Sequence, residues 1–449
     1  MKNKYLNNSY IMRMNKLITG LLLLCLPLLV QAQEKKDSVL NLSLQDAQQF
    51  ALRNNYSILN ANLDIESAKL KVWETTAIGL PQVSAKLPFQ YTPELSGTIK
   101  NFLPPNTNFN DLKWSLNADL TVSQLIFSGS YIVGLQSAKV YQSLSKINFE
   151  KSKQDVLESV TTSYFNILLA RENKQILDTT YKNLLKTNHD MQAMNRQGFV
   201  EETDVDQLQI TLSNVKTSLD VITRLEDISV KLLKIQLGIE LNQKIELTDS
   251  LKALLNAFTF DQLLLTDFVL DNNVTYQMLN AQVKSQELLL KLKKSEFLPD
   301  LAAYYQHEKV FNNKAFTFSA ADVVGVQLNI PIFSSGARLA RVGQAKRELL
   351  KAQKNKLQAS DGLWVDFYSS RSSLLAAREN YETEIKNLAL ARKIYERSLV
   401  KYSNGIISAT ELTTNQNQFL TEQSKYFTSI QNLVVAKTKL EKLLSSTNK

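Results

Sequence analysis

The sequence predicts a mainly α-helical fold made of two tandem repeats, each with two β-strands and one long coiled-coil helical hairpin. Three observations predict it: residues that interrupt helices are scarce, the chain repeats itself, and short segments alternate apolar and polar residues. The 449 residues include only 12 glycines and 8 prolines. These shares lie well below the usual values of about 7% and 5%. Such a composition favours long, uninterrupted helices.

Segment 1–32 is expected to be a signal peptide rather than part of the fold. Basic residues lead into an apolar run from Leu17 to Val30, and Val30-Gln31-Ala32 has the small-residue pattern of a cleavage site. Met14 could equally be the first residue of the protein. Cys25 is the only cysteine and follows three leucines, not the small residue that lipid attachment requires. We therefore expect a cysteine-free exported chain, which suits an oxidising compartment.

Four pairs of landmarks establish the internal repeat. They occur in the same order in both halves, at offsets between 206 and 218 residues. An ordered series of this kind indicates duplication of one structural unit. The pairs are Asn54-Asn55 with Asn272-Asn273, Leu80-Pro81 with Leu298-Pro299, Ile126 to Gly129 with Ile332 to Gly336, and Gly198 to Val205 with Gly405 to Leu412.

The repeat divides the chain into a signal, two copies and a connecting segment between them. In each copy a helix precedes two strands, and the hairpin follows the second strand. The first copy is 33–238, with strands at about 82–92 and 113–126 and the hairpin at 129–238. The connecting segment is 239–262, and the second copy is 263–449, with strands at about 300–309 and 322–332 and the hairpin at 336–445.

The predicted strands alternate apolar and polar residues with a period of two, which places one kind of side chain on each face. In the first copy the apolar set includes Leu116 and Leu120, and in the second it includes Val324, Leu328 and Ile330. Segments of about ten residues with two such faces match a transmembrane β-strand. A soluble two-sheet β-domain alternates in the same way, so the pattern alone leaves both structures open.

The predicted long helices, 129–195 and 336–402, contain no proline and span 67 residues each. At 1.5 Å per residue each is on the order of 100 Å long. A helix of this length needs to bury a stripe against its neighbours. The returning segment of the second hairpin has coiled-coil spacing, since Leu412, Phe419, Tyr426, Leu433 and Leu440 lie seven residues apart. Gly198 and Gly405 are expected to end the long helices.

No motif for catalysis or metal binding occurs in the sequence. The two histidines, His189 and His307, are far apart, and there is no zinc-protease motif, nucleophile elbow or phosphate-binding loop. We therefore expect no enzyme, no metal site and no cofactor. The net charge is +9, but the basic residues are spread among acidic ones, so no nucleic-acid groove is predicted.

Taken together, these features resemble the TolC family of bacterial outer-membrane efflux proteins. Leu-Pro pairs at 80–81 and 298–299 stand where helices enter strands, and segments 126–129 and 332–336 stand where strands enter helices. The tip turns complete the set, and the resemblance covers about 42–445. It implies a homotrimer whose four strands per chain close a 12-stranded β-barrel in the outer membrane, continuous with a periplasmic α-barrel.

The resemblance also implies partners and function. The chain would be the outer-membrane channel of a tripartite efflux system, conducting small molecules passively from a periplasmic adaptor and an inner-membrane transporter to the exterior. It would contact outer-membrane lipid. Loops 94–112 and 309–321 would face outside, and segment 239–262 would form a belt around the barrel. Two alternatives remain open: the exit duct of a type I protein secretion system, and a periplasmic coiled-coil scaffold or adhesin. The sequence identifies neither cargo nor pump.

By the same resemblance, Asp204, Glu411 and Tyr402 would lie at the periplasmic constriction. An acid near a helix N-terminus is also favoured by the helix dipole alone, so gating and capping both remain open for Asp204 and Glu411. Thr414 and Ile407 stand where the family has an acid and an arginine, which leaves cation selectivity open. The adaptor would dock on the hairpin tips, formed by Gly198, Phe199, Val200, Gly405, Ile406 and Ile407.

Overall fold

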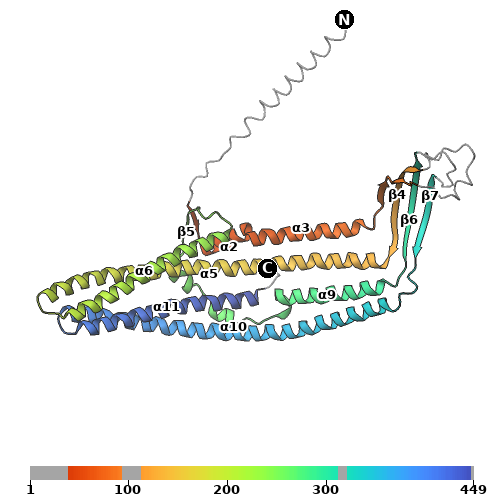
Figure 1. The fold of residues 1–449 in the computed structure, drawn as a ribbon. Helices are drawn as coiled ribbons and strands as arrows, with labels where there is room; N and C mark the ends of the chain where they lie inside the picture. The colour runs from red at the N-terminus through yellow and green to blue at the C-terminus, as the bar shows by residue number, and fades with distance from the viewer. Residues whose placement is uncertain (1–38, 94–112, 312–320, 446–449) are drawn as a thin grey trace, which may run out of the picture.

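A computed structural model describes residues 39–93, 113–311 and 321–445. The expected signal peptide, loop 94–112 and most of loop 309–321 lie outside the described residues. The described chain is elongated, with strands at one end, hairpin tips at the other, and helices running side by side between them (Figure 1). The mainly helical fold of two repeats is confirmed.

The two copies contain matching elements, joined by a short mixed segment. In the first copy the elements are β1 Leu40–Leu42, α2 Leu44–Asn54, α3 Tyr56–Ala77, β2 Gln82–Lys86, β3 Phe89–Tyr91, β4 Trp114–Ser128, α5 Gly129–Arg196 and α6 Glu202–Leu237. The joining segment has β5 Ile245–Leu247, α7 Leu251–Asn256 and α8 Phe260–Leu265. The second copy has the 3-10 helix η2 Leu270–Asn272, α9 Val274–Ser295, β6 Asp300–Val310, β7 Asp322–Asn329, α10 Ala337–Ser403 and α11 Ala409–Leu444.

The helices form a single row rather than a compact bundle. Near the strands the order is α3, α5, α9 and α10, each packed against the next. Towards the tips α6 packs on α5, and α11 packs on both α5 and α10. Helices α5 and α10 have 68 and 67 residues and run through both halves of the row. No helix in the described ranges combines the length and apolar character that a membrane crossing requires.

Two asparagines join helices end to end in this row. Asn55 caps α3 by accepting a hydrogen bond from the Ser57 N–H (2.8 Å), and its amide donates to the Gln236 carbonyl near the end of α6 (2.6 Å). Asn273 repeats the arrangement: it accepts from the Thr275 N–H (3.0 Å) and donates to the carbonyl of Leu443 in α11 (3.3 Å). Each side chain thus satisfies a free donor at one helix start and a free carbonyl at another helix end. This accounts for the repeated Asn-Asn landmark.

All strand pairs at the far end are antiparallel, in the order β2-β4-β6-β7, and β3 also pairs with β4. One strand was expected over 82–92, but the structure has two. Lys86 pairs with Asp119 and Phe89 with Leu116 in one unbroken register. The interruption falls at Pro88, which has no N–H to donate to the ladder.

The predicted strand 322–332 is also too long, because β7 ends at Asn329. Pro331 follows, and then Ser335 and Gly336 both have positive φ, 47° and 80°. Such backbone angles are incompatible with a strand. In the first copy, by contrast, β4 runs directly into α5.

The largest core lies midway along the row, around Tyr164 of α5. Its hydroxyl donates to the carbonyl of Leu42 in β1 (2.9 Å) and lies 3.0 Å from an Asp249 carboxylate oxygen. Strand β1 pairs in parallel with β5 from the joining segment. The core thus ties the start of the described chain to the segment between the copies. That this segment forms a belt around an assembled barrel stays a prediction.

We predict that Asn55→Leu destabilises the protein by about 2 kcal/mol, because it leaves a helix-start N–H and the part-buried carbonyl of Gln236 without this partner. The midpoint of thermal unfolding, followed by circular dichroism in detergent, should fall. Asn60→Leu, at an exposed position of the same helix, is the matched control and should leave the midpoint nearly unchanged. Equal midpoints for the two variants would show that the junction does not matter for stability.

Candidate functional site: the hairpin tips

Both hairpin tips turn through the same backbone motif, as the repeat predicts. Gly198 has φ +79° and Gly405 φ +69°, a conformation that costs glycine little. At the first tip the Phe199 N–H donates to the Met194 carbonyl (3.0 Å) and the Gly198 N–H to the Asn195 carbonyl (2.9 Å). This pair of bonds is the Schellman arrangement, which closes the end of a long helix. The second tip repeats it around Gly405.

The residues after each glycine, all predicted to face a partner, divide into two kinds. Phe199 and Ile406 are 78% and 67% exposed. Val200 and Ile407 are half-buried and pack against the apolar clusters below the tips. Each tip therefore presents one large apolar side chain to solvent and uses the next one to hold the turn in place.

The returning helices begin differently at the two tips. The Ser408 hydroxyl caps α11 by accepting a hydrogen bond from the Glu411 N–H (3.2 Å). Helix α6 begins after Glu201, whose side chain makes no capping bond. Glu411 is exposed in the first turn of α11. Because Ser408 already caps this helix, the Glu411 carboxylate is left facing solvent.

The structure brings Asp204 and Tyr402 together where the two hairpins meet. The Thr410 hydroxyl of α11 donates to the Asp204 carboxylate of α6 at 3.3 Å. Tyr402 packs in the apolar clusters of both hairpins, and its buried hydroxyl has no hydrogen-bond partner among the described residues. Burial raises the pKa of the Tyr402 phenol, and the charge of Asp204 raises it further. Glu411 lies apart from this pair, on the exposed side of its helix.

Sequence reasoning missed a layer of polar side chains inside the hairpins, farther from the tips. Gln423 of α11 donates to the side-chain oxygen of Asn173 in α5 (2.8 Å), which links the two hairpins. Gln416, seven residues earlier on the same stripe, is fully buried, and neither of its amide atoms has a partner within the described ranges. Buried polar groups without partners cost stability. The signal was present in the sequence as glutamines at seam positions, where coiled coils use polar residues to fix register.

The strand register sorts the side chains of the sheet onto two faces, because directly paired residues point to the same side. One face is mostly apolar and the other mostly polar. Gln124, His307, Lys309 and Asp322 are polar exceptions on the apolar face. That face carries Val83, Ala85, Phe89, Tyr91, Leu116, Ala118, Leu120, Val122, Ala303, Tyr305, Val324, Val326 and Leu328. The polar face carries Gln82, Ser84, Lys86, Asn117, Asp119, Thr121, Ser123, Gln306, Glu308, Gln327 and Asn329.

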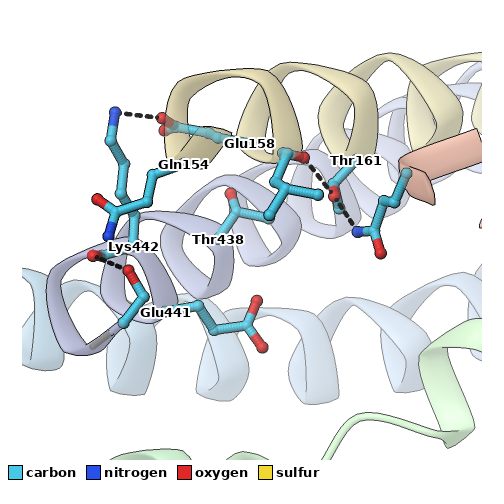
Figure 2. A pocket seen from close by; sticks show the side chains of 9 residues that line it. Gln154, Glu158, Thr161, Thr438, Glu441 and Lys442 are labelled. Atoms are coloured by element: carbon cyan, nitrogen blue, oxygen red, sulfur yellow. Dashed lines mark hydrogen bonds and ion pairs between the residues drawn. The ribbon is translucent and has the colours of Figure 1, made fainter. Parts of the chain in front are cut away.

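An open pocket lies midway along the row, between α5 of the first repeat and α11 of the second (Figure 2). Lys442 of α11 contacts two carboxylates of α5, those of Glu158 (2.7 Å) and Asp155 (2.6 Å). Burial opposes the charge of Lys442, but these hydrogen bonds outweigh burial and raise its pKa. Thr161 accepts a hydrogen bond from Gln48 of α2 (2.8 Å). The charged and polar groups of the pocket thus bind one another, so we assign it a structural role.

In the described part of the chain, no three His, Cys, Asp or Glu side chains come together as ligands for a metal ion. His307 lies 2.8 Å from the Asp322 carboxylate, which also accepts a hydrogen bond from Tyr305 (2.6 Å). His189 is exposed next to Asp190. These contacts are ordinary polar pairs on exposed surfaces.

Comparison with solved structures finds channels of the same fold. The CmeC outer-membrane channel of Campylobacter jejuni is 17% identical with a TM-score of 0.74, and the match covers 90% of this chain and 87% of that one. VceC, an outer-membrane protein of Vibrio cholerae, is 13% identical with a TM-score of 0.73 over 90% and 97% of the chains. The open MtrE outer-membrane channel of Neisseria gonorrhoeae is 15% identical, with a TM-score of 0.68 over 89% and 88%.

Sequence comparison gives the family. A search of curated proteins found no match. The model of the family described as outer membrane efflux protein matches residues 47–225 and 265–446, which include most of both copies. The predicted resemblance to TolC-like channels is confirmed, and the family is one of channels, not enzymes. The chain therefore belongs to the outer membrane efflux protein family.

Proposed function

We propose that three copies of this outer-membrane efflux channel close into one duct, which passes small molecules from a periplasmic adaptor and inner-membrane transporter to the exterior. The observation that carries the proposal is the open, single-layer protomer, in which β2 and β7 are the sheet edges. Edge strands with free backbone groups are not tolerated in lipid. Closure across copies removes the edges, and three copies of four strands give a 12-stranded barrel.

The two faces of the sheet support this arrangement. An apolar face turned to lipid and a polar face turned to a water-filled lumen is the pattern of membrane barrels. The helix row continues the same wall on the periplasmic side, because β2, β4, β6 and β7 lie next to α3, α5, α9 and α10 in the same order. A solute would thus leave the α-helical duct directly into the barrel.

At the closed end we propose that Asp204, Glu411 and Tyr402 form the constriction. The Thr410 contact holds Asp204 between neighbouring hairpins, so three-fold symmetry would repeat this carboxylate around the axis. Glu411 is exposed and free to line the opening. Rings of carboxylates favour cations in pores, and Thr414 leaves this chain with fewer carboxylates there than its relatives in the family.

We propose that the adaptor contacts Phe199 and Ile406 directly, with Val200 and Ile407 supporting these residues from behind. Large exposed apolar side chains at a protruding tip are typical of interaction sites. Gly198 and Gly405 would act by setting the turn. This division of roles refines the expectation that all six residues dock the partner.

The exit duct of a type I protein secretion system would use the same architecture, so cargo separates the two functions. We predict that deleting the gene for this chain increases sensitivity to toxic small molecules by several-fold and leaves the set of secreted proteins unchanged. Growth inhibition across a compound panel and mass spectrometry of the culture medium measure the two outcomes. Loss of a secreted protein without increased sensitivity would support the secretion duct instead. Membership of an efflux family decides against a periplasmic scaffold or adhesin.

The lipid face can be tested with a pair of adjacent residues. We predict that Leu328→Arg costs about 2–4 kcal/mol if the residue lies near the middle of the bilayer, so that little protein assembles in outer membranes. Gln327→Arg, on the opposite face of the same strand, is the matched control and should assemble normally. Quantitative immunoblotting of outer-membrane fractions measures both. Equal assembly of the two variants would contradict the assignment of faces.

For the constriction we predict that Asp204→Ala or Glu411→Ala increases single-channel conductance or lowers cation preference in planar bilayers, because each removes a negative charge from the opening. Glu202→Ala removes an exposed acid from the same first turn of α6 and should change neither quantity. If Glu411→Ala behaves like this control, Glu411 serves only the helix dipole.

A further inference from the structure

Helix α3, at one edge of the row, has an apolar stripe that no part of the described protomer covers. Its members follow one another at steps of three, four and seven residues, the spacing of a coiled-coil seam. Trp73, the largest of them, is 62% exposed. The exposed stripe consists of Tyr56, Leu59, Leu63, Leu70 and Trp73.

Helix α10, at the other edge, has a second uncovered stripe with a gap in it. Leu339, Leu350 and Leu357 are exposed and share one side of the helix. Gly343 lies on the same stripe, and a Cβ placed there would meet nothing within 4 Å. The α10 stripe thus has an open notch at Gly343, between Leu339 and Leu350.

Both stripes face away from the protomer, on the side where the next helix of a continuing single layer would pack. At 100° per residue, each lies roughly 130–150° around its helix from the face that packs inside the protomer. On α3 the inner face includes Ile58, Ala61 and Ala68, and on α10 it includes Ala345 and Leu363. A helix in a curved single layer contacts one neighbour on each side at about such an angle. Both stripes therefore suit a further helix of the same wall.

Contacts across the row indicate that Trp73 and Gly343 lie at similar heights along the helices. The Tyr131 hydroxyl of α5 donates to the Thr76 carbonyl of α3 (3.2 Å), and the preceding residue, Ser130, lies 3.3 Å from the hydroxyl of Ser295 at the end of α9. There Glu296 accepts a hydrogen bond from Arg341 of α10 (3.2 Å). Thr76 and Arg341 thus mark about the same height. Trp73 and Gly343 lie within about one helical turn of these markers, on the side away from the strands.

Charge also matches between the two edges. Glu66 lies on the α3 stripe between Leu63 and Leu70, Lys346 lies at the edge of the α10 stripe between Gly343 and Leu350, and both are exposed. Counted from the same markers, the two residues differ in height by roughly 7.5 Å, or about one and a half helical turns, which long side chains can span. An acid on one edge and a base on the other favour pairing of unlike edges, α3 with α10, over pairing of like edges.

We infer that Trp73 of one subunit packs on Gly343 of the next subunit. Helices α3 and α10 of neighbouring subunits then form the interface on the periplasmic side of the barrel. The missing side chain at Gly343 makes room for the indole, and Glu66 pairs with Lys346 farther from the strands, in the adjoining layers. Leu70 and Leu63 pack around Leu350 in the adjoining layers. This inference rests on the three-copy channel proposed above and names the contact that joins its copies.

Cysteine cross-linking tests the contact in a Cys25→Ala background, which removes the only native cysteine. The double variant Trp73→Cys/Gly343→Cys, treated in outer membranes with a short bifunctional thiol reagent, should give bands of two and three chains on a denaturing gel. Lys71→Cys/Gly343→Cys is the matched control, because Lys71 is exposed about 200° around α3 from Trp73. It should give at least tenfold less linked product.

Filling the notch provides a second test. Gly343→Leu should reduce the trimer fraction at least fivefold by native mass spectrometry, whereas Gly362→Leu, at another open helical glycine of α10, should not. Both changes favour the helix itself, so loss of the trimer would not reflect misfolding. If the wild type is a trimer but the Trp73→Cys/Gly343→Cys variant does not cross-link, or links no more than its control, the inference is wrong. The proposed three-copy channel would still stand. A wild type that is not a trimer overturns the channel as well.

Discussion

The backbone N–H and C=O groups along the outer edges of β2 and β7 constrain the whole assembly, because hydrocarbon offers them no partner. Each such group left unpaired in lipid costs several kcal/mol. Within the described chain the sheet runs from β2 to β7 and does not close on itself. Helices α3 and α10 continue the row behind the two edge strands, and each leaves an apolar stripe of side chains exposed. An efflux channel of this family can therefore be complete only when other copies cover both edges.

The two repeats differ in how the last strand passes into the long helix. Strand β4 has neighbours on both sides and stays in the ladder to Ser128, where α5 begins at once. Strand β7 has one neighbour and ends at Asn329, and the chain then passes through Pro331 and the positive φ angles of Ser335 and Gly336 before α10. At its end β4 is held by β6 alone, because β2 pairs with β4 only as far as Ser123. Pro331 and the positive φ angles before α10 therefore account for the shorter β7. Inside the hairpins, the buried amides of Gln416 and Gln423 interrupt the apolar packing between helices.

Much of this fold could be predicted from the sequence because its markers act locally. Gly198 and Gly405 end the long helices through their own backbone angles, and the period-two strands carry their faces in their residue types. Other features depend on distant contacts. The Asn54-Asn55 landmark was visible as a repeat, but the role of Asn55 requires the carbonyl of Gln236, far along the chain. Val200 and Ile407 were predicted to face a partner, and only the packing below the tips explains why they turn inward.

At the proposed constriction, the sequence indicated acids near two helix starts, and the structure places them in different surroundings. Asp204 is held by Thr410 between hairpins, and Glu411 stays in solvent. The central claim is the closure of open protomers into a ring, and an electron-cryomicroscopy map of the protein in lipid nanodiscs tests it most directly. Our account predicts three copies around a three-fold axis, with β7 of each copy beside β2 of the next. A single copy in the disc, or β2 paired with β7 of the same chain, would contradict it.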